Sequence, residues 1–301
     1  MKIISGVLTV LTTLFNSREE IDLDEMNKLI EILISGNVNG ITLFGIGGEF
    51  YKLSENEKAH MLKNFIKTVN KRVTTIVSVT DHSAKNACLK AKEAQEAGAD
   101  CLMILPPFFA GPDVYSVCDH IFKVLSSVDI PAIIQYAPQE TNLVIPDEVF
   151  YRLSEEFGDR IYFKIESNDP GHFITELVKK GINKIFIGSG GISFYETLER
   201  GAVGVMPGCS LFDFFVSIYS NYIEGKKEIS FNLHNKILPY LMFCGGSNEK
   251  FLSSEKYFLK LRGWIKNDYT RAPFYRLDPT DINILNKYKE IYFTNSAYNM
   301  S

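Results

Sequence analysis

The sequence predicts an α/β fold, namely a (β/α)8 TIM barrel followed by a C-terminal helical segment. Short apolar runs rich in β-branched residues alternate with amphipathic helical patterns up to about residue 225. Eight such runs occur, each followed by a helical pattern, and their starts are roughly 20–35 residues apart, which is typical of βα units. A doubly wound open sheet is the structural alternative, but no G-x-G-x-x-G motif follows the first run.

The first half of the chain contains four of the expected strands. Gly6 to Thr12 is short, apolar and β-branched, which favours a buried strand. Apolar residues from Met26 to Ile34 then repeat at helical spacing, and the pattern stops at Gly36. Ser54 and Glu57 form a capping-box pattern at the start of the next helix. The remaining elements expected here are strands at Ile41–Phe44, Thr74–Val79 and Cys101–Leu105, and a helix from about Ser83 to Gly98.

The second half of the barrel repeats this alternation. Pro146 stands where a proline opens a helix. The expected strands are Ala132–Gln135, Ile161–Ile165, Lys184–Ile187 and Val203–Met206. Helices are expected through Phe173, Leu177 and Val178, from Ser193 to Arg200, and from near Leu211.

Strand patterns stop beyond Gly225, so we expect a barrel domain at 1–225 and a helical segment at 226–301. The polar tail from Asn295 to Ser301 is expected to be frayed. The three helices predicted in the C-terminal segment lie near Leu233–Phe243, Lys250–Trp264 and Asp281–Tyr292.

The composition excludes several classes of protein. The chain has 32 basic and 36 acidic residues and no basic stripe, so we expect no nucleic-acid partner. No run of 18 uninterrupted apolar residues predicts a membrane span. The apolar N-terminal run has one basic residue and no small-x-small cleavage pattern, so it is interpreted as a strand rather than a signal peptide. Five cysteines without a C-x-x-C pair favour a reducing, cytoplasmic compartment, and no metal or organic cofactor is indicated.

The active site of such a barrel lies at the C-terminal ends of its strands, and Lys164 stands at one of them. Its neighbours of opposite parity are bulky and apolar, so the lysine is predicted to point into the barrel. Desolvation favours the neutral amine, which can attack a carbonyl group. The alternative is an ordinary strand-end lysine that pairs with Glu166 or reaches water.

Two glycine-rich loops and one acid–histidine pair stand at other strand ends. The loops Gly45–Glu49 and Gly188–Gly191 could hold a carboxylate or phosphate through backbone N–H groups, or could be tight turns. Asp81 and His82 could be an acid/base pair, or could cap the following helix. The Phe-rich segment Phe212, Phe214 and Phe215 is interpreted as core or as a subunit contact.

Taken together, these motifs resemble the dihydrodipicolinate synthase and N-acetylneuraminate lyase superfamily over roughly residues 3 to 290. The segments that carry the resemblance are Gly45–Glu49 for the family's G-T-T-G-E loop, Phe163–Glu166 for its I-K-E strand, Ala97–Asp100 before a proline-proline-aromatic run, and Gly201–Gly204. The resemblance implies a TIM barrel, usually a homotetramer. It also implies that Lys164 forms a Schiff base with pyruvate or another 2-oxo acid.

The chain departs from this family at the position of its catalytic tyrosine. The family's Y-N-x-P-x-x-T segment aligns without gaps on 135–141, which places Gln135 at the tyrosine position and Glu140 where the synthases carry an arginine. A shift of one residue would place Tyr136 there instead, but would lose the match at Pro138 and Thr141. Because successive strand residues face opposite ways, only one of the two can face Lys164; we prefer Gln135 and keep Tyr136 as the alternative acid/base.

The proton relay of the synthases is also missing from this sequence. Ile46 and Gly47 stand where the synthases have threonines, and Phe109 stands where they have a second tyrosine. Glutamine cannot act as an acid or base, so Gln135 cannot replace the tyrosine in such a relay. Without the arginine, the bidentate partner of a second substrate carboxylate is lost.

The resemblance therefore favours a Schiff-base lyase that acts on 2-keto-3-deoxy sugar acids, by aldol cleavage to pyruvate or by dehydration. Lys164 would be the nucleophile, and the backbone of Ile46 and Gly47 would hold the carboxylate of the 2-oxo acid. The further residues predicted to bind or orient the substrate are Glu49, Glu166, Gly188, Gly190 and Met206. The alternatives are a dihydrodipicolinate synthase that condenses pyruvate with aspartate semialdehyde, a non-catalytic barrel that binds a 2-oxo acid and, more remotely, a phosphate-binding barrel.

Overall fold

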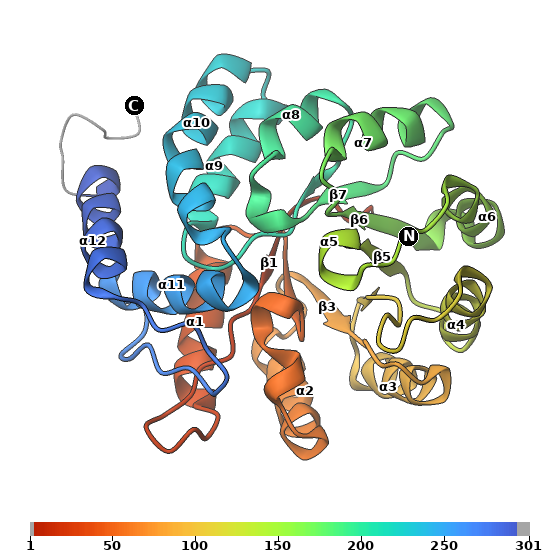
Figure 1. Cartoon of the computed structure of the whole chain (residues 1–301), viewed down its shortest axis with the longest axis horizontal. Coiled ribbons are helices and arrows are strands. Elements are labelled where there is room, and N and C mark those ends of the chain that lie inside the picture. The colour runs from red at the N-terminus through yellow and green to blue at the C-terminus, as the bar shows by residue number, and fades with distance from the viewer. Residues whose placement is uncertain (1–2, 294–301) are drawn as a thin grey trace.

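Eight parallel strands close into a barrel in the computed structural model, which describes residues 3–293. Neighbouring strands along the chain pair with one another, and β8 pairs back onto β1, so the predicted barrel is confirmed (Figure 1). The strands are β1 Gly6–Val10, β2 Gly40–Leu43, β3 Thr74–Ser78, β4 Cys101–Ile104, β5 Ala132–Tyr136, β6 Ile161–Ile165, β7 Ile185–Ile187 and β8 Gly204–Val205.

Helices surround the strands as an outer ring, and three more helices lie together on one side of it (Figure 1). The ring consists of α1 Leu23–Ser35, α2 Glu55–Val69, α3 Ala84–Ala97, α4 Val114–Ser126, α6 Asp147–Phe157, α7 Pro170–Lys179, α8 Phe194–Glu199 and α9 Phe212–Ile223, with the one-turn helix α5 Pro138–Thr141 after β5. The C-terminal helices are α10 Lys227–Cys244, α11 Asn248–Leu261 and α12 Pro279–Phe293. None of the helices in the described chain is both long enough and apolar enough to cross a membrane.

Alternate residues of each strand face the inside of the barrel. Apolar side chains among them form one compact cluster together with Ile4 and Met206, which lie just outside β1 and β8. The strand residues in it are Leu8, Val10, Ile76, Cys101, Met103, Ile133, Tyr162 and Phe186. The intervening residues, such as Ile134, Phe163 and Ile165, belong to a second cluster beneath the helices. Burial of each large apolar side chain contributes about 1.5–3 kcal/mol to folding, so this two-sided burial explains why the strands read as continuous apolar runs.

The barrel closes where two glycines meet. Gly6 of β1 pairs with Gly204 of β8. A Cβ atom on Gly204 would lie 2.0 Å from the carbonyl oxygen of Gly6, so any side chain there would force the two strands apart. The sequence pattern placed both residues in strands but did not indicate this close approach.

Local signals in the sequence located most helix ends. Ser54 and Glu57 form a complete capping box at the start of α2. Gly98 ends α3 in the left-handed conformation, with φ of 100°, which glycine adopts without strain. Pro146 is the N-cap of α6 rather than its first residue. Phe212, Phe214 and Phe215 are buried, which confirms the core interpretation of that segment.

Several boundaries differ from the prediction. The eighth strand has two residues instead of four, while β5 extends one residue further, to Tyr136. Helix α4, between β4 and β5, and the short α5 were not located from the sequence. The C-terminal helices are longer at their N-termini than expected, because the pattern was read from apolar residues and the first turns are polar. The tail from Asn295 to Ser301 lies outside the described residues.

Two buried histidines make the free energy of unfolding depend on pH. Burial lowers the pKa of His120 on α4 and of His234 on α10, so the folded state favours their neutral rings. Histidines of the unfolded chain bind protons below about pH 6.5, so the unfolded state takes up protons first as the pH falls. We therefore expect these groups to leave stability unchanged above pH 7 and to lower it progressively below about pH 6.5. Urea unfolding at pH 7 and at a pH well below 6.5 measures this change in the free energy of unfolding. The loss of stability at the lower pH should be smaller in His120→Phe. An equal loss in that variant would contradict the expectation.

Candidate active site

Lys164 lies inside the C-terminal end of the barrel. It shares the inward parity of Tyr162 on β6, while its neighbours Phe163 and Ile165 pack beneath the helices. The backbone register pairs Lys164 with Gln135 on β5. Only 5% of its surface is exposed, so the strand pattern predicted its inward direction correctly.

Glu166 holds the amine of Lys164 and is itself held by two further donors. Its Oε1 atom lies 3.1 Å from Lys164 Nζ and accepts a hydrogen bond from the backbone N–H of Ser189 at 2.9 Å. Its Oε2 atom accepts a hydrogen bond from Gln135 Nε2 at 2.5 Å. Side chains from two neighbouring strands and the backbone after β7 thus converge on one carboxylate.

Tyr136 lies on the other side of the sheet. Its ring packs against Phe150 of α6 and Phe173 of α7, with centroids 5.3 and 5.4 Å apart. The structure therefore brings Gln135 beside Lys164 and does not bring Tyr136 there. The reason is the alternation of side chains along β5, which places adjacent residues on opposite faces.

The loop after β2 presents two unused backbone donors. Residues Ile46–Gly48 form a single 3-10 turn. None of the hydrogen bonds within residues 3–293 uses the N–H of Ile46 or of Gly47. These are the first two donors of the turn, which have no partner inside a helix and can bind an anion.

Glu49 stabilises this loop from beneath. Its side chain is completely buried, and its carboxylate pairs with Lys52 at 3.0 Å and with Lys256 of α11. Glu49 also adopts the left-handed conformation, with φ of 57°. The structure thus places this predicted substrate-orienting residue against two lysines of the loop and of α11, rather than against Lys164.

Helix α11 joins several of the site loops, a role that the sequence analysis did not detect. Glu255 accepts hydrogen bonds from the backbone N–H groups of Cys209 and Ser210, after β8. At the N-terminus of α11, Asn248 donates to Glu140 of α5 at 2.6 Å. The one available signal was the charged pair Glu255–Lys256 between the apolar residues Leu252 and Phe258 of a predicted helix.

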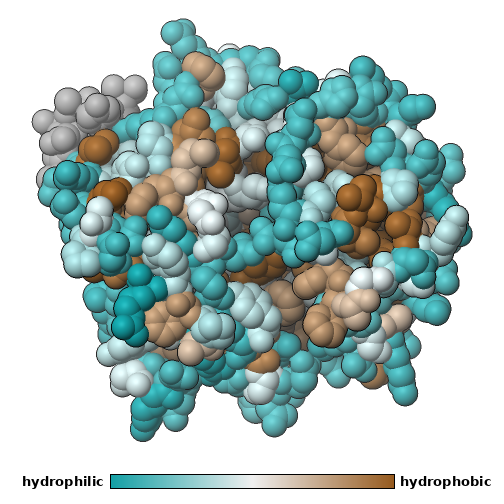
Figure 2. All heavy atoms as spheres, viewed as in Figure 1, coloured by the Kyte–Doolittle hydropathy of each residue, from teal (hydrophilic) through white to brown (hydrophobic). Residues whose placement is uncertain are grey.

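Phe251 of α11 lies over the glycine loops of the site. Its ring is 3.6 Å from the Cβ position of Gly47, 3.9 Å from that of Gly190 and 2.8 Å from that of Gly208. This face of the molecule is hydrophilic around its rim and hollowed near the centre, where apolar side chains reach the surface (Figure 2). An aromatic ring from the C-terminal segment therefore helps to shape the space above the barrel.

The remaining predicted residues surround the same region. Met206 faces the barrel interior and is 2% exposed. Gly190 is in the left-handed conformation, with φ of 64°. A Cβ atom on Gly188 would lie 2.2 Å from Glu166 Oε1, so glycine is needed there for the carboxylate to approach the backbone.

We expect Gly188→Ala to displace the Glu166 carboxylate from Lys164. Under the function proposed below, this should lower kcat/KM by on the order of 10²-fold, the cost of a displacement of about 1 Å in a reacting group. Gly188 has a negative φ of −102°, so alanine introduces contact without backbone strain. Gly246→Ala is the matched control, since its Cβ would meet only the flexible Lys250 side chain, at 3.4 Å. Equal activity of the two variants would contradict the prediction.

Asp81 and His82 take part in the start of α3. Asp81 Oδ1 accepts the N–H of Ser83, the N-cap residue, and Oδ2 pairs with Lys90, both at 2.8 Å. The ring of His82 packs against Phe108, with centroids 4.9 Å apart. These contacts favour the helix-cap interpretation over an acid/base pair.

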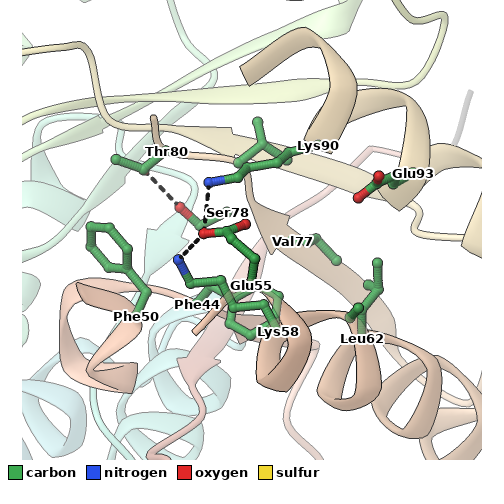
Figure 3. A pocket seen from close by; sticks show the side chains of 12 residues that line it. Phe44, Phe50, Glu55, Lys58, Leu62, Val77, Ser78, Thr80, Lys90 and Glu93 are labelled. Atoms are coloured by element: carbon green, nitrogen blue, oxygen red, sulfur yellow. Dashed lines mark hydrogen bonds and ion pairs between the residues drawn. The ribbon is translucent and has the colours of Figure 1, made fainter. Parts of the chain in front are cut away.

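A separate small pocket lies between α2, α3 and β3 (Figure 3). Glu55 crosses it and pairs with Lys58 at 2.9 Å and with Lys90 at 3.4 Å. The pocket has a volume of about 50 Å³, which suffices for a few water molecules. None of the residues around Lys164 lines this pocket. In the described part of the chain, no three His, Cys, Asp or Glu side chains come close enough together to hold a metal ion.

Comparison with known proteins assigns the chain to a family. The sequence model of the dihydrodipicolinate synthetase family matches residues 3–288, nearly the whole chain. The chain belongs to this family. Its structure is similar to that of a putative dihydrodipicolinate synthetase from Pseudomonas aeruginosa, with a TM-score of 0.89, 25% identity and coverage of 96% of this chain and 99% of the other.

Two curated members of the family are similar to the chain at low identity. The 4-hydroxy-tetrahydrodipicolinate synthase of Bacillus subtilis is 24% identical over 240 residues, 78% of this chain and 82% of the relative. The L-2-keto-3-deoxyarabonate dehydratase of Azospirillum brasilense is 24% identical over 282 residues, 91% and 90% of the two chains. The family therefore includes both a synthase and a sugar-acid dehydratase among the relatives of this chain.

Proposed function

We propose that the protein is a Schiff-base-forming lyase that acts on a 2-oxo acid. The observation that carries this proposal is the buried amine of Lys164 at the mouth of the barrel, 3.1 Å from the carboxylate of Glu166. An amine that is shielded from water and paired with a proton acceptor can become the neutral nucleophile that attacks a ketone. The unused N–H groups of Ile46 and Gly47 suit the carboxylate next to that ketone.

The chemistry follows from these positions. Lys164 Nζ attacks C2 of the bound 2-oxo acid, and loss of water leaves an iminium ion. The iminium withdraws electrons from the neighbouring carbon atoms, which stabilises the enamine formed on cleavage of a carbon–carbon bond or on removal of a proton from C3. Phe251 restricts the space above the reacting atoms.

The substrate class that we propose is a 2-keto-3-deoxy sugar acid, which the enzyme either cleaves to pyruvate or dehydrates. Glu140 occupies the position where the synthases carry an arginine, and its carboxylate accepts a hydrogen bond from Asn248. Carboxylate and amide groups both bind hydroxyl groups, and the carboxylate of Glu140 repels a second carboxylate. The similarity to the Azospirillum brasilense dehydratase, which extends over 91% of the chain, also supports this class.

The second candidate is a dihydrodipicolinate synthase, which condenses pyruvate with aspartate semialdehyde. It is favoured by the similarity to the Bacillus subtilis synthase. Against it, Gln135 stands beside Lys164 where the synthases have a tyrosine, and glutamine exchanges no proton in this role.

Borohydride reduction in the presence of pyruvate, followed by peptide mass mapping, tests the proposal. We expect a reduced pyruvate adduct on the peptide that contains Lys164. A panel of 2-keto-3-deoxy acids, scored for pyruvate release against loss of water, then separates aldolase from dehydratase. If the enzyme turns over pyruvate with aspartate semialdehyde and none of the 2-keto-3-deoxy acids, it is the synthase instead. The absence of any pyruvate adduct on the protein would refute Schiff-base chemistry.

We further propose a cytoplasmic homotetramer, as the family resemblance implies. Phe109 and Tyr115 are 74% and 85% exposed, which is unusual for aromatic side chains and suits a subunit contact. The five cysteines are free thiols, as a reducing compartment favours. Size-exclusion chromatography with light scattering measures the molar mass of the assembly. A molar mass equal to one chain would refute the tetramer. The double variant Phe109→Ser with Tyr115→Ser should have a lower molar mass than the wild-type assembly.

A further inference from the structure

The geometry points to Glu166 as the group that moves protons during the reaction, in place of the tyrosine that this chain lacks. This inference rests on the proposed Schiff-base function. Glu166 Oε1 lies 3.1 Å from Lys164 Nζ, within direct reach of the atom that becomes the iminium nitrogen. A proton-transfer group must first satisfy this distance.

The surroundings of Glu166 hold it in place but do not compete for the proton. Gln135 and the backbone of Ser189 donate to its two oxygens, and neither can accept a proton from it. Glycine at position 188 leaves the space that the carboxylate fills, 2.2 Å from the position of a Cβ atom. Gln135 is therefore a positioning residue, which acts on the reaction through Glu166.

Three other ionisable groups near this end of the barrel make their contacts away from Lys164. Tyr136 lies on the outer face of the sheet, between Phe150 and Phe173. Glu49 is buried in contact with Lys52 and Lys256. Glu140 is hydrogen-bonded to Asn248. Among the predicted site residues, Glu166 alone contacts the lysine amine.

The proton transfers balance with Glu166 as the single carrier during imine formation. Its carboxylate takes a proton from the Lys164 ammonium, and the freed amine pair forms the bond to C2 as the carbonyl pair moves to oxygen. Glu166 returns the proton to that oxygen, and the carbinolamine forms. It then takes a proton from the nitrogen and gives it to the leaving hydroxyl group, so water departs and the protonated iminium remains beside a carboxylate.

The same carboxylate then generates the enamine. It takes a proton from C3, the C–H pair forms the C2–C3 double bond, and the iminium pair moves to nitrogen. In a dehydration, the enamine pair expels the hydroxyl group of C4, which leaves as water with the proton from Glu166. With pyruvate alone, the protonated Glu166 returns a solvent-exchanged proton to C3, so the methyl group exchanges with the solvent.

The test compares wild-type protein with Glu166→Gln in D2O with pyruvate. NMR follows the loss of the methyl signal, and borohydride trapping measures the imine on Lys164 in the same samples. We expect the variant to form the trapped adduct after long incubation but to exchange the methyl protons on the order of 10²–10⁴-fold more slowly. Glu166→Asp keeps a carboxylate on a side chain one carbon shorter, so it should recover part of the exchange rate that Glu166→Gln loses.

Glu176→Gln is the matched control, because Glu176 pairs with Lys179 on the surface of α7, the helix that follows β6. It should exchange at the wild-type rate. If Glu166→Gln exchanges within about threefold of wild type, Glu166 does not carry the protons and the inference is wrong. Failure of the proposed function is distinguishable, since the wild-type protein itself would then give no adduct.

Discussion

Lys164→Ala should abolish both the borohydride-trapped adduct and turnover of any 2-oxo acid substrate. The amine is the atom that forms the covalent bond, and removal of a covalent nucleophile costs on the order of 10⁴–10⁶ in kcat. Alanine carries no amine, and water in the space that the lysine leaves cannot form an imine with the ketone. Single-turnover kinetics with mass spectrometry of the reduced adduct provides the measurement.

Lys184→Ala is the matched control for Lys164. Lys184 precedes β7 at the opposite end of the strands and pairs with the exposed Asp159 at 2.5 Å. We expect this variant to keep the adduct and the turnover. Should Lys164→Ala bind the 2-oxo acid as tightly as wild type while wild type itself shows no turnover, the protein is a non-catalytic barrel instead.

The second large effect concerns stability rather than chemistry. Glu49→Gln should lower the free energy of unfolding by about 3–5 kcal/mol, because it removes one partner of a buried ion pair and leaves the other charge uncompensated. Lys52 and Lys256 are 2% and 0% exposed; Lys52 keeps its ion pair with Glu249 at 2.7 Å, whereas Lys256 loses the carboxylate that it contacts. Burial already lowers the pKa of Lys256, and Lys52 adds to that effect.

Chemical denaturation measures this loss, which corresponds to a fall of on the order of 10 °C in Tm. The double variant Glu49→Gln with Lys256→Met is the control. It removes the unpaired charge together with the carboxylate, so it should be more stable than Glu49→Gln alone. If the single variant is as stable as wild type, the pair contributes nothing and the glycine loop is held by other contacts.

Local patterns in the chain were sufficient for most of the fold. Apolar residues at a period of two or 3.6 indicate strands and helices wherever one face must be buried, so the eight strands and the closed barrel were predictable. The capping box of Ser54 and Glu57 was visible because its two members stand three residues apart. Helix α4 was not located from the sequence, although its buried residues Val117, Ile121 and Val124 recur at helical spacing.

The candidate site was predictable where it depends on strand parity. Inward parity placed Lys164 in the barrel and allowed only one of Gln135 and Tyr136 to face it. The preference for Gln135 came from the match of the family segment at Pro138 and Thr141. Glu49 shows the limit of such reasoning. Its motif suggested a residue that faces substrate, but its partner Lys256 comes from a helix more than 200 residues away in the chain.

The sequence by itself therefore determined the barrel, the position of Lys164 at a strand end and the face on which that lysine lies, since each follows from periodicity over a few residues. Only the tertiary structure decided which groups surround the amine. It brought Glu166, Gln135 and the backbone of Ser189 together, and it placed Phe251 of α11 above the glycine loops. The physical reason is that such contacts join elements that are distant in the chain, and local periodicity carries no information about which distant side chains will meet.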